Sequence, residues 1–251
     1  MMTCGKLYID DKLIKELYID GQRVDYLDID GQCVYRRAAP PGSIIFNTVG
    51  THSWTVPYGY TSVKVCMVGG GGGGISSTTA SGGGGAGEHF NDDVAVADSQ
   101  TVTVVVGGAG GVGGSGGASK FHTVTVNGGS AGYVGKPSYS PSANVVFFPC
   151  VGVQHKNGYN PGCNSYGVGQ GSPFGDGGHS GGEGCNPDLG PAKGGVGAGG
   201  GSYYGSNLPA VGGGRGEVRV YWGDQNSSEA IHYVLSDMTD EEKQKFNIQE
   251  N

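Results

Sequence analysis

The sequence predicts a mostly β or irregular fold, in which a collar of β-strands frames a sandwich of packed polyglycine helices and a small β-repeat region precedes both. Three observations lead to this prediction. Residues 69 to 216 hold 47 of the 54 glycines, strand-like segments flank the glycine clusters, and the first 36 residues repeat with a period of ten. The predicted units are a repeat region at 1–37, a linker at 38–42, a glycine-rich domain at 43–222 and a tail at 223–251.

The glycine clusters are the strongest signal, because glycine loses more conformational entropy on folding than any other residue. Flexible linkers lack strand-forming segments, and collagen needs Gly strictly at every third position, a phase that this chain does not keep. Threefold polyglycine helices resembling polyproline II can pack side by side where no side chain separates them. Each cluster is therefore predicted to form one rod, and Gly111→Val is expected to unfold the protein or block its assembly.

Segments of alternating or continuous apolar residues are predicted to form the β collar. Pro57, Tyr58 and Gly59 supply a turn within it. The expected strands are residues 44–46, 53–56, 62–68, 101–106, 121–126 and 217–222. Because the third of these runs directly into Gly69, the collar is expected to frame the rods.

The N-terminal repeat places Leu and Ile two residues apart, so that both share one face of a strand. Asp-Gly after the second and third copies favours a tight turn, and each decad is predicted to be a strand–turn–strand unit too small to bury its apolar face alone. The copies are expected to form either a plain antiparallel meander or an arrangement around a pseudo-threefold axis. The predicted fibre-attachment residues are Leu7, Ile9, Leu17, Ile19, Leu27 and Ile29.

Two further segments flank the glycine-rich domain. The paired Pro40 and Pro41 disfavour both a helix and a central strand, which predicts the linker. Thr239 followed by Glu242 has the spacing of a capping box, which predicts a short acidic helix through about Phe246. The tail is expected to be either docked on the domain or frayed.

The charge of the chain lies mainly in the tail. The formal net charge is −7, and from Asp224 onward the chain has seven acids against two bases. The rest carries no basic stripe, and no apolar stretch approaches about 18 residues, so neither nucleic-acid binding nor membrane insertion is expected. The N-terminus lacks the apolar segment of a secretory signal peptide, so the protein is expected to fold in a cytoplasm.

The six cysteines fall at irregular spacings without a Cys-x-x-Cys pair. This pattern does not support a zinc ribbon, and the irregular spacing leaves free thiols as the expectation. The minor alternative is a metal site or a disulfide among Cys150, Cys163, Cys185, His155 and His179. No metal or cofactor is therefore predicted.

Residues 46–74 resemble the entry to the glycine-rich domain of phage tail-fibre proteins. The likeness rests on Trp54-Thr55-Val56-Pro57, on the Gly-x-Thr-Ser-Val that begins at Gly59, and on the six glycines at 69–74. Together with the clusters at 107–117, 177–182 and 212–216, this arrangement resembles the receptor-recognising tip adhesins on the long tail fibres of T-even-like phages. The similarity covers about residues 44–222.

In that family, packed polyglycine helices form a sandwich, an N-terminal portion attaches to the trimeric fibre end, and loops between the glycine motifs bind a surface receptor. The resemblance therefore implies a virion protein at the tip of a tail fibre, folded in the host cytoplasm. It also implies two partners, a trimeric tail-fibre shaft protein and a bacterial outer-membrane protein or surface glycan.

The inserts between the clusters, residues 133–151, 154–166, 172–176, 183–193 and 202–211, are rich in Tyr, Phe, Asn, Pro and Ser. Such residues combine rigid contact area with adaptable hydrogen bonds, as in antibody loops. Aromatic rings can also cover rods that lack side chains, and about half of them are assigned to that role. The predicted receptor-binding residues are Tyr139, Asn144, Phe147, Phe148, Tyr159, Asn160, Asn164, Tyr166, Phe174, Tyr203, Tyr204 and Asn207.

The sequence does not predict an enzyme. Asp92 and Asp93 are adjacent and in a strand would point to opposite faces, and the glycines around His179 and Glu183 disfavour a helix there. No glycine run is followed by the Lys-Ser/Thr of a phosphate-binding loop. The remaining acid–base candidates are Glu88, His89, Asp176 and Asp188. The alternatives to an adhesin are a tail-fibre assembly chaperone or structural protein and, behind these, a glycan-cleaving tip enzyme.

Overall fold

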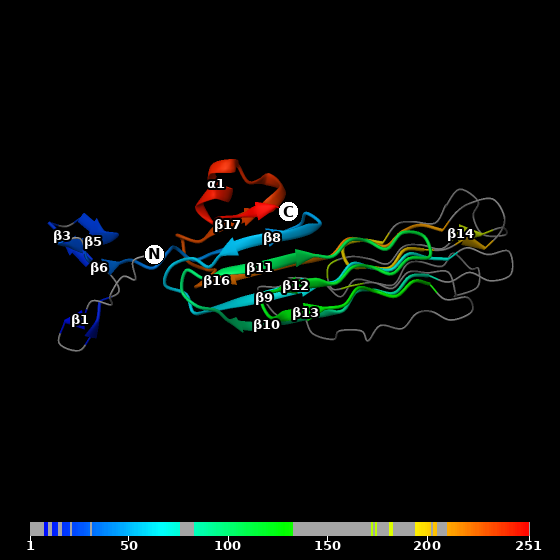
Figure 1. The fold of residues 1–251 in the computed structure, drawn as a ribbon, viewed down its shortest axis with the longest axis horizontal. Helices are drawn as coiled ribbons and strands as arrows, with labels where there is room; N and C mark the ends of the chain where they lie inside the picture. The colour runs from blue at the N-terminus through cyan, green and yellow to red at the C-terminus, as the bar shows by residue number, and fades with distance from the viewer. Residues whose placement is uncertain are drawn as a thin grey trace.

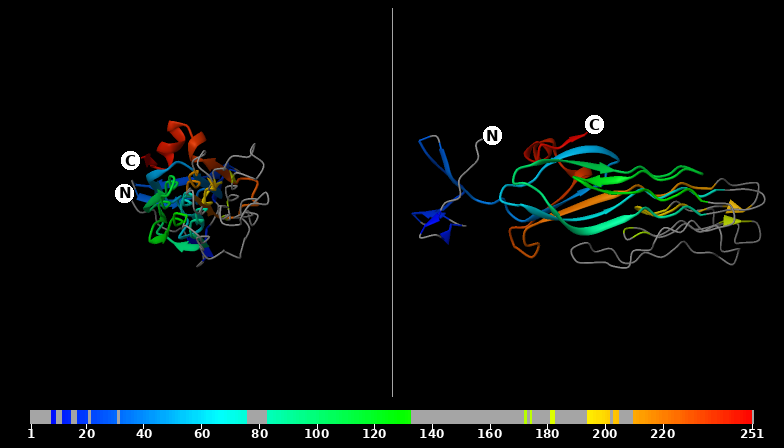
Figure 2. Two further views of the ribbon diagram at one scale, coloured as in Figure 1. Left: turned by 90° about the vertical axis from the view of Figure 1, so that its right-hand side faces the viewer. Right: turned by 60° about the horizontal axis from the view of Figure 1, so that its bottom comes forward.

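The protein is elongated, with small hairpins at one end, a β-sandwich in the middle and glycine-rich segments that extend to the other end (Figure 1). The C-terminal helix lies against the sandwich, away from both ends (Figures 1 and 2). The computed structural model describes residues 8–9, 12–14, 17–20, 22–30, 32–75, 83–132, 172, 174, 181–182, 194–201, 203–204 and 210–250.

The sandwich consists of two open five-stranded sheets. The first has the order β10 (His89–Ala95), β9 (Ser62–Val68), β16 (Glu217–Trp222), β7 (Gly42–Phe46) and β17 (Ile231–Val234). Its pairs are antiparallel except for β17 with β7. The second sheet is antiparallel throughout, with the order β13 (Val124–Val126), β12 (Ser119–Phe121), β11 (Thr101–Val106), β8 (Gly50–Thr55) and β18 (Gln249–Glu250).

Most of the predicted collar strands are present, with two differences. The segment predicted as one strand at 121–126 is divided between β12 and β13, because His122 adopts a left-handed φ of 52° and the chain reverses there. Strand β10 was not predicted, since its Asp92 and Asp93 have low strand propensity. Pairing with β9 along all seven residues outweighs that propensity.

The inner faces of the two sheets form one apolar core. Inward residues alternate along each strand, as in Val218, Val220 and Trp222 of β16, which is the pattern that a sandwich requires. The ring of Trp54 on β8 lies 5.8 Å from that of Trp222 and 6.1 Å from that of Phe121, measured between centroids. Side-chain packing therefore joins the two sheets.

The glycine-rich segments beyond the sandwich form a second body, the glycine bundle, which we define as residues 69–74, 83–88, 107–118, 127–132, 194–201 and 210–216. Its innermost segment, 69–74, donates hydrogen bonds to three neighbouring segments in turn. The pairs are Gly69–Glu88, Gly70–Gly117, Gly71–Gly214, Gly72–Gly85, Gly73–Gly114 and Gly74–Val211, with N···O distances of 2.8 to 3.0 Å. Residues that are three apart in segment 69–74 therefore donate to the same neighbouring segment.

The carbonyl groups of the same segment accept hydrogen bonds from two further segments, through the N–H groups of Gly129 and Gly200 among others, and from the other arm of 107–118, through Gly110. Buried backbone groups must find partners, and here they find them in other segments instead of within a helix or a sheet. The innermost segment is thus tied to chain on all sides.

Close approach leaves no room for side chains along residues 69–73 of the innermost segment. A Cβ on Gly71 would overlap the Ala198 carbonyl, and one on Gly72 would overlap the Ser130 carbonyl. A Cβ on Gly111 would meet nothing within 4 Å. The expectation that Gly111→Val unfolds the protein is therefore wrong on steric grounds, because this glycine lies at an exposed turn of the bundle.

The N-terminal decads form three hairpins: β1 (Tyr8–Ile9) with β2 (Lys12–Leu13), β3 (Leu17–Ile19) with β4 (Gln22–Val24), and β5 (Tyr26–Ile29) with β6 (Gln32–Arg36). This confirms the predicted strand–turn–strand unit, and Asp20 and Asp30 adopt the positive φ of its turns, 51° and 52°. Within the described part of the chain the hairpins share no sheet, so the plain meander is wrong.

The C-terminal tail is docked, not frayed. Strands β17 and β18 each add an edge to one sheet, and between them lie the 3₁₀ turn η1 (Leu235–Asp237) and the helix α1 (Asp240–Lys245). The predicted capping box is confirmed: Thr239 Oγ1 accepts the Glu242 N–H at 3.3 Å, and the Glu242 carboxylate accepts the Thr239 N–H at 2.9 Å.

Buried side chains explain why the tail docks. The ring of Phe246 lies 5.0 Å from that of Tyr233 and 6.0 Å from that of Trp222, and Leu235 and Ile248 are buried in the same core. The tail thus supplies part of the sandwich core.

Two of the cysteines differ from expectation. Cys33 in β6 and Cys66 in β9 are disulfide-bonded. The expectation of free thiols is therefore wrong for these two residues.

Candidate functional site

The end of the molecule opposite the hairpins (Figure 1) holds two of the predicted receptor-binding residues, Tyr203 and Tyr204. One piece of it is a short parallel strand pair, in which β14 (Gly181–Gly182) pairs with β15 (Tyr203–Tyr204). This pair lies at the far end of the bundle (Figure 1). Tyr203 and Tyr204 are thus brought to the distal end.

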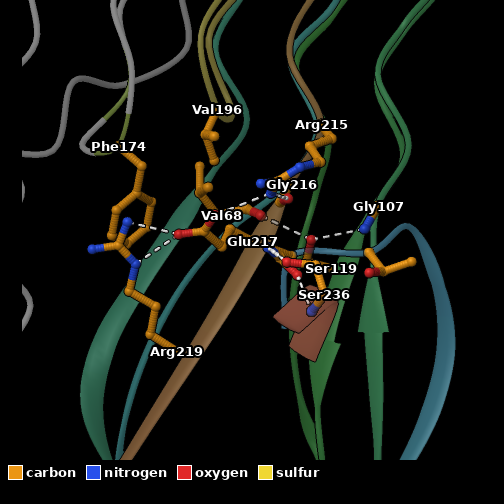
Figure 3. A network of polar contacts seen from close by, with 12 residues as sticks. Val68, Gly107, Ser119, Phe174, Val196, Arg215, Gly216, Glu217, Arg219 and Ser236 are labelled. Carbon is orange, nitrogen blue, oxygen red and sulfur yellow. Dashed lines mark hydrogen bonds and ion pairs between the residues drawn. The ribbon is translucent and has the colours of Figure 1, made fainter. Parts of the chain in front are cut away.

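Phe174 lies closer to the sandwich. Its ring is covered by the guanidinium group of Arg219, whose Cζ is 4.2 Å from the ring centroid (Figure 3). A single β-bridge joins Phe174 to Val196 of the bundle. A cation over an aromatic face is an attractive contact, so Phe174 is held against strand β16.

The partner of Phe174 belongs to a charged cluster at the seam between sandwich and bundle (Figure 3). Glu217 Oε1 lies 2.6 Å from Arg219 Nη2, and Glu217 Oε2 lies 3.0 Å from Arg215 Nη1. Glu217 is only 5% exposed, and a buried carboxylate requires such pairing. With two arginines on one glutamate, the cluster keeps a positive excess beside the Phe174 ring.

A buried serine joins the two bodies at the same seam. Ser119 Oγ donates to the Val68 carbonyl at 2.8 Å and accepts the Gly107 N–H at 3.0 Å (Figure 3). Val68 and Gly107 lie where strands β9 and β11 pass into the bundle. One hydroxyl therefore satisfies two backbone groups at the point where sheet pairing ends.

One exposed apolar residue on the bundle was missed from the sequence. Val112 is 58% exposed at the turn of residues 111–114, where Gly113 has a φ of +67° and the Gly114 N–H donates to the Gly111 carbonyl. The sequence did contain a signal for this residue, because Val112 is an apolar residue within a glycine run that has to reverse direction.

The predicted attachment residues divide by exposure. Leu17 and Leu27 are half-buried, whereas Ile19 and Ile29 are 51% and 55% exposed. Tyr18 and Tyr26 are exposed as well. The hairpin end therefore presents apolar and aromatic surface. The side chain of Ile9 is outside the described part of the structure, as is Leu7.

Most of the predicted receptor-binding residues lie outside the described residues. They are Tyr139, Asn144, Phe147, Phe148, Tyr159, Asn160, Asn164, Tyr166 and Asn207.

The acid–base candidates that are described do not converge. The Glu88 carboxylate accepts hydrogen bonds from the Asn127 backbone at 3.0 Å and side chain at 2.9 Å, a structural use. Burial lowers the pKa of His89 and outweighs the opposing effect of Glu88. Asp92 Oδ1 accepts the Asp93 N–H at 2.8 Å. Asp176, His179, Glu183 and Asp188 are outside the described residues.

The described residues lack two features that would indicate other functions. They contain no group of three or more His, Cys, Asp or Glu side chains placed to hold a metal ion. Nor do they include a helix of the length and apolar character needed to cross a membrane.

The fold and the residues at the seam together define the class of protein: a β-sandwich whose strands continue into a bundle of glycine segments. The comparison with protein families agrees: the model of the glycine-rich domain matches residues 47–223. The chain belongs to this glycine-rich domain family. No curated protein matches the sequence. The N-terminal hairpins and strand β17, α1 and β18 of the tail lie outside the matched range.

Proposed function

We propose that the chain is a phage tail-fibre tip adhesin. Its hairpin end attaches to the end of a trimeric fibre shaft, and the inserts between its glycine clusters bind a bacterial outer-membrane protein or surface glycan. In this proposal it is a binding protein of the virion without catalytic activity, folded in the host cytoplasm and specific for its host through the inserts.

The observation that carries the proposal is the separation of two surfaces by the β-sandwich and the glycine bundle. Ile19 and Ile29 are exposed on the hairpins at one end, and the chain reaches β14 and β15 at the other end (Figure 1). An adhesin needs this arrangement, because attachment and recognition must not interfere with each other. Exposed apolar residues that recur in a repeated unit also favour a partner at that end.

We further propose that the glycine bundle is a sandwich of packed polyglycine helices. The support is the period of three in the hydrogen bonds of segment 69–74, since polyproline II-type helices have three residues per turn and no internal hydrogen bonds. Rods of this kind give a stiff support from which inserts can vary without changing the frame.

The test is binding of the purified protein to intact Gram-negative cells. The wild type is compared with a variant carrying Ala at Tyr159, Tyr166, Tyr203 and Tyr204, and melting curves establish that both are folded. We expect saturable binding by the wild type and its loss in the variant. The matched control carries Ser at Ile19 and Ile29, and it should bind cells normally but be missing from purified particles.

Two results would overturn the proposal. Negligible binding by both proteins across a broad strain panel, with the protein absent from purified virions, would favour an assembly chaperone. Release of reducing ends from host polysaccharide would favour a glycan-cleaving enzyme instead.

A further inference from the structure

We infer that Arg219 and Phe174 form a positioning contact that fixes the chain at residue 174 to the sandwich and so sets where the neighbouring inserts stand. This inference rests on the proposed function, because it assigns the contact a part in receptor binding. Neither residue touches the receptor in this role: Arg219 acts through Phe174, and Phe174 acts through the inserts on either side of it.

Arg219 is a rigid partner because of its position in the sheet and its contacts with Glu217. It lies on β16, which has paired strands on both sides, β9 and β7. Its guanidinium is held by Glu217, with Nε at 2.7 Å and Nη2 at 2.6 Å from Oε1. A charge-assisted pair of this kind fixes the guanidinium plane, and that plane covers the Phe174 ring (Figure 3).

A second set of contacts holds the same piece of chain from the side of the bundle. Ser172 Oγ donates to the Val196 carbonyl and accepts the Phe174 N–H at 3.1 Å. Ser172 is buried, and Phe174 forms its bridge to Val196. Residues 172 and 174 are thus tied both to a strand of the sandwich and to a segment of the bundle.

The contact differs from ordinary core packing. Phe174 is only half-buried and is not part of the apolar core of the sandwich, so the ring can be changed without opening that core. Its effect reaches the neighbouring inserts because they are covalently continuous with residues 172–174.

The test compares three proteins: the wild type, Phe174→Leu and Phe174→Tyr. Leucine keeps an apolar side chain but removes the aromatic face, whereas tyrosine retains that face. Amide hydrogen exchange of peptides spanning residues 172–204 and 101–106 is measured together with melting temperature and cell binding. We expect exchange at 172–204 to be about three- to thirtyfold faster in the leucine variant, as loss of a cation–π contact implies. Exchange at 101–106 and the melting temperature should not change, and tyrosine should restore the wild-type values.

Cell binding should fall in Phe174→Leu and return in Phe174→Tyr. Unchanged amide exchange at 172–204 in the leucine variant would overturn the inference that the contact fixes this part of the chain, whatever the effect on cell binding. Faster exchange that also includes 101–106 would reduce the contact to a general structural role and so overturn the positioning inference. Faster local exchange with undiminished cell binding by Phe174→Leu would do the same. Absence of binding by the wild type itself would instead overturn the proposed function.

Discussion

The sandwich and the glycine bundle are held together by opposite means. In the sandwich, large side chains such as Trp54, Phe121 and Trp222 fill the space between two sheets. In the bundle, the innermost segment 69–74 has no side chains, and backbone groups of different segments bind one another directly. Removing atoms should therefore damage the first body, and adding atoms should damage the second.

This difference explains why so glycine-rich a chain orders at all. Each buried glycine has a large entropic penalty on folding, and the bundle offsets it with hydrogen bonds in three directions and with close van der Waals contact between backbones. The sandwich contributes by holding the ends of several segments, since β9, β11 and β16 pass directly into or out of the bundle. The two bodies therefore depend on each other.

The largest expected effect comes from adding one methyl group inside the bundle. Gly72→Ala places a Cβ against the Ser130 carbonyl. A backbone obstacle does not give way as a side chain does, so we expect a loss of about 3 kcal/mol or more. Gly111→Ala is the matched control and should stay within about 0.5 kcal/mol of the wild type. Soluble yield and chemical denaturation measure both, and equal stability of the two variants would refute packing at Gly72.

The second effect comes from removing atoms from the sandwich. Phe246→Ala deletes a buried ring that packs on Tyr233 and Trp222 and should lower the free energy of unfolding by about 3 to 5 kcal/mol. Gln244→Ala, on the exposed side of α1, is the control. Urea denaturation followed by tryptophan fluorescence is the measurement. A loss below about 1 kcal/mol would mean that the tail is not part of the cooperative core.

The third prediction sharpens the comparison at the seam. Ser119→Ala leaves the Gly107 N–H without the Ser119 hydroxyl that it binds and should cost about 1 to 3 kcal/mol. The control is Ser115→Ala, because Ser115 Oγ is an exposed acceptor for the Ala131 N–H. If Ser119→Ala and Ser115→Ala have the same denaturation midpoint, the seam tolerates a Gly107 N–H without the Ser119 hydroxyl.

The smallest effect lies outside both bodies, where the tail meets the hairpins. Glu229 binds Arg23 at 2.8 Å and Arg37 at 2.5 Å, and its hydrogen bonds with Arg23 and then Arg37 lower the pKa of its carboxyl below 4.5. A lowered folded-state pKa means that the contact stabilises the protein above about pH 4.5 and is lost as the pH falls through the lowered value. Unfolding of the wild type and Glu229→Gln, compared between pH 7 and pH 3, should therefore converge at acid pH. A constant difference across that range would contradict the assignment, and Glu241→Gln on α1 is the control.

Local patterns in the sequence predicted much of the scaffold. The alternation in residues 217–222, the decad hairpins and the capping box at Thr239 all depend on near neighbours, and the structure has each of them. Strand β10 was missed because two aspartates stand at its centre, and β17 and β18 because their pairing partners lie far away in the sequence. Local propensity contains no information about such pairing.

The site was less predictable for the same reason. Phe174 could be singled out as an aromatic residue in an insert, but its partner Arg219 lies 45 residues further on and belongs to a strand. Likewise, a count of glycines did not distinguish Gly72 from Gly111. What separates them is a carbonyl from a distant segment, which only the assembled bundle brings near.

The docked tail has a consequence for synthesis. Strand β7 lies near the start of the chain and has both of its neighbours only after β16 and β17 have been synthesised. Between β7 and β16 lie 170 residues. Non-local pairing of this kind slows folding and exposes unpaired edges while the chain emerges from the ribosome. A chain interrupted before Phe246 would lack part of its core, so cellular proteases should remove incomplete copies.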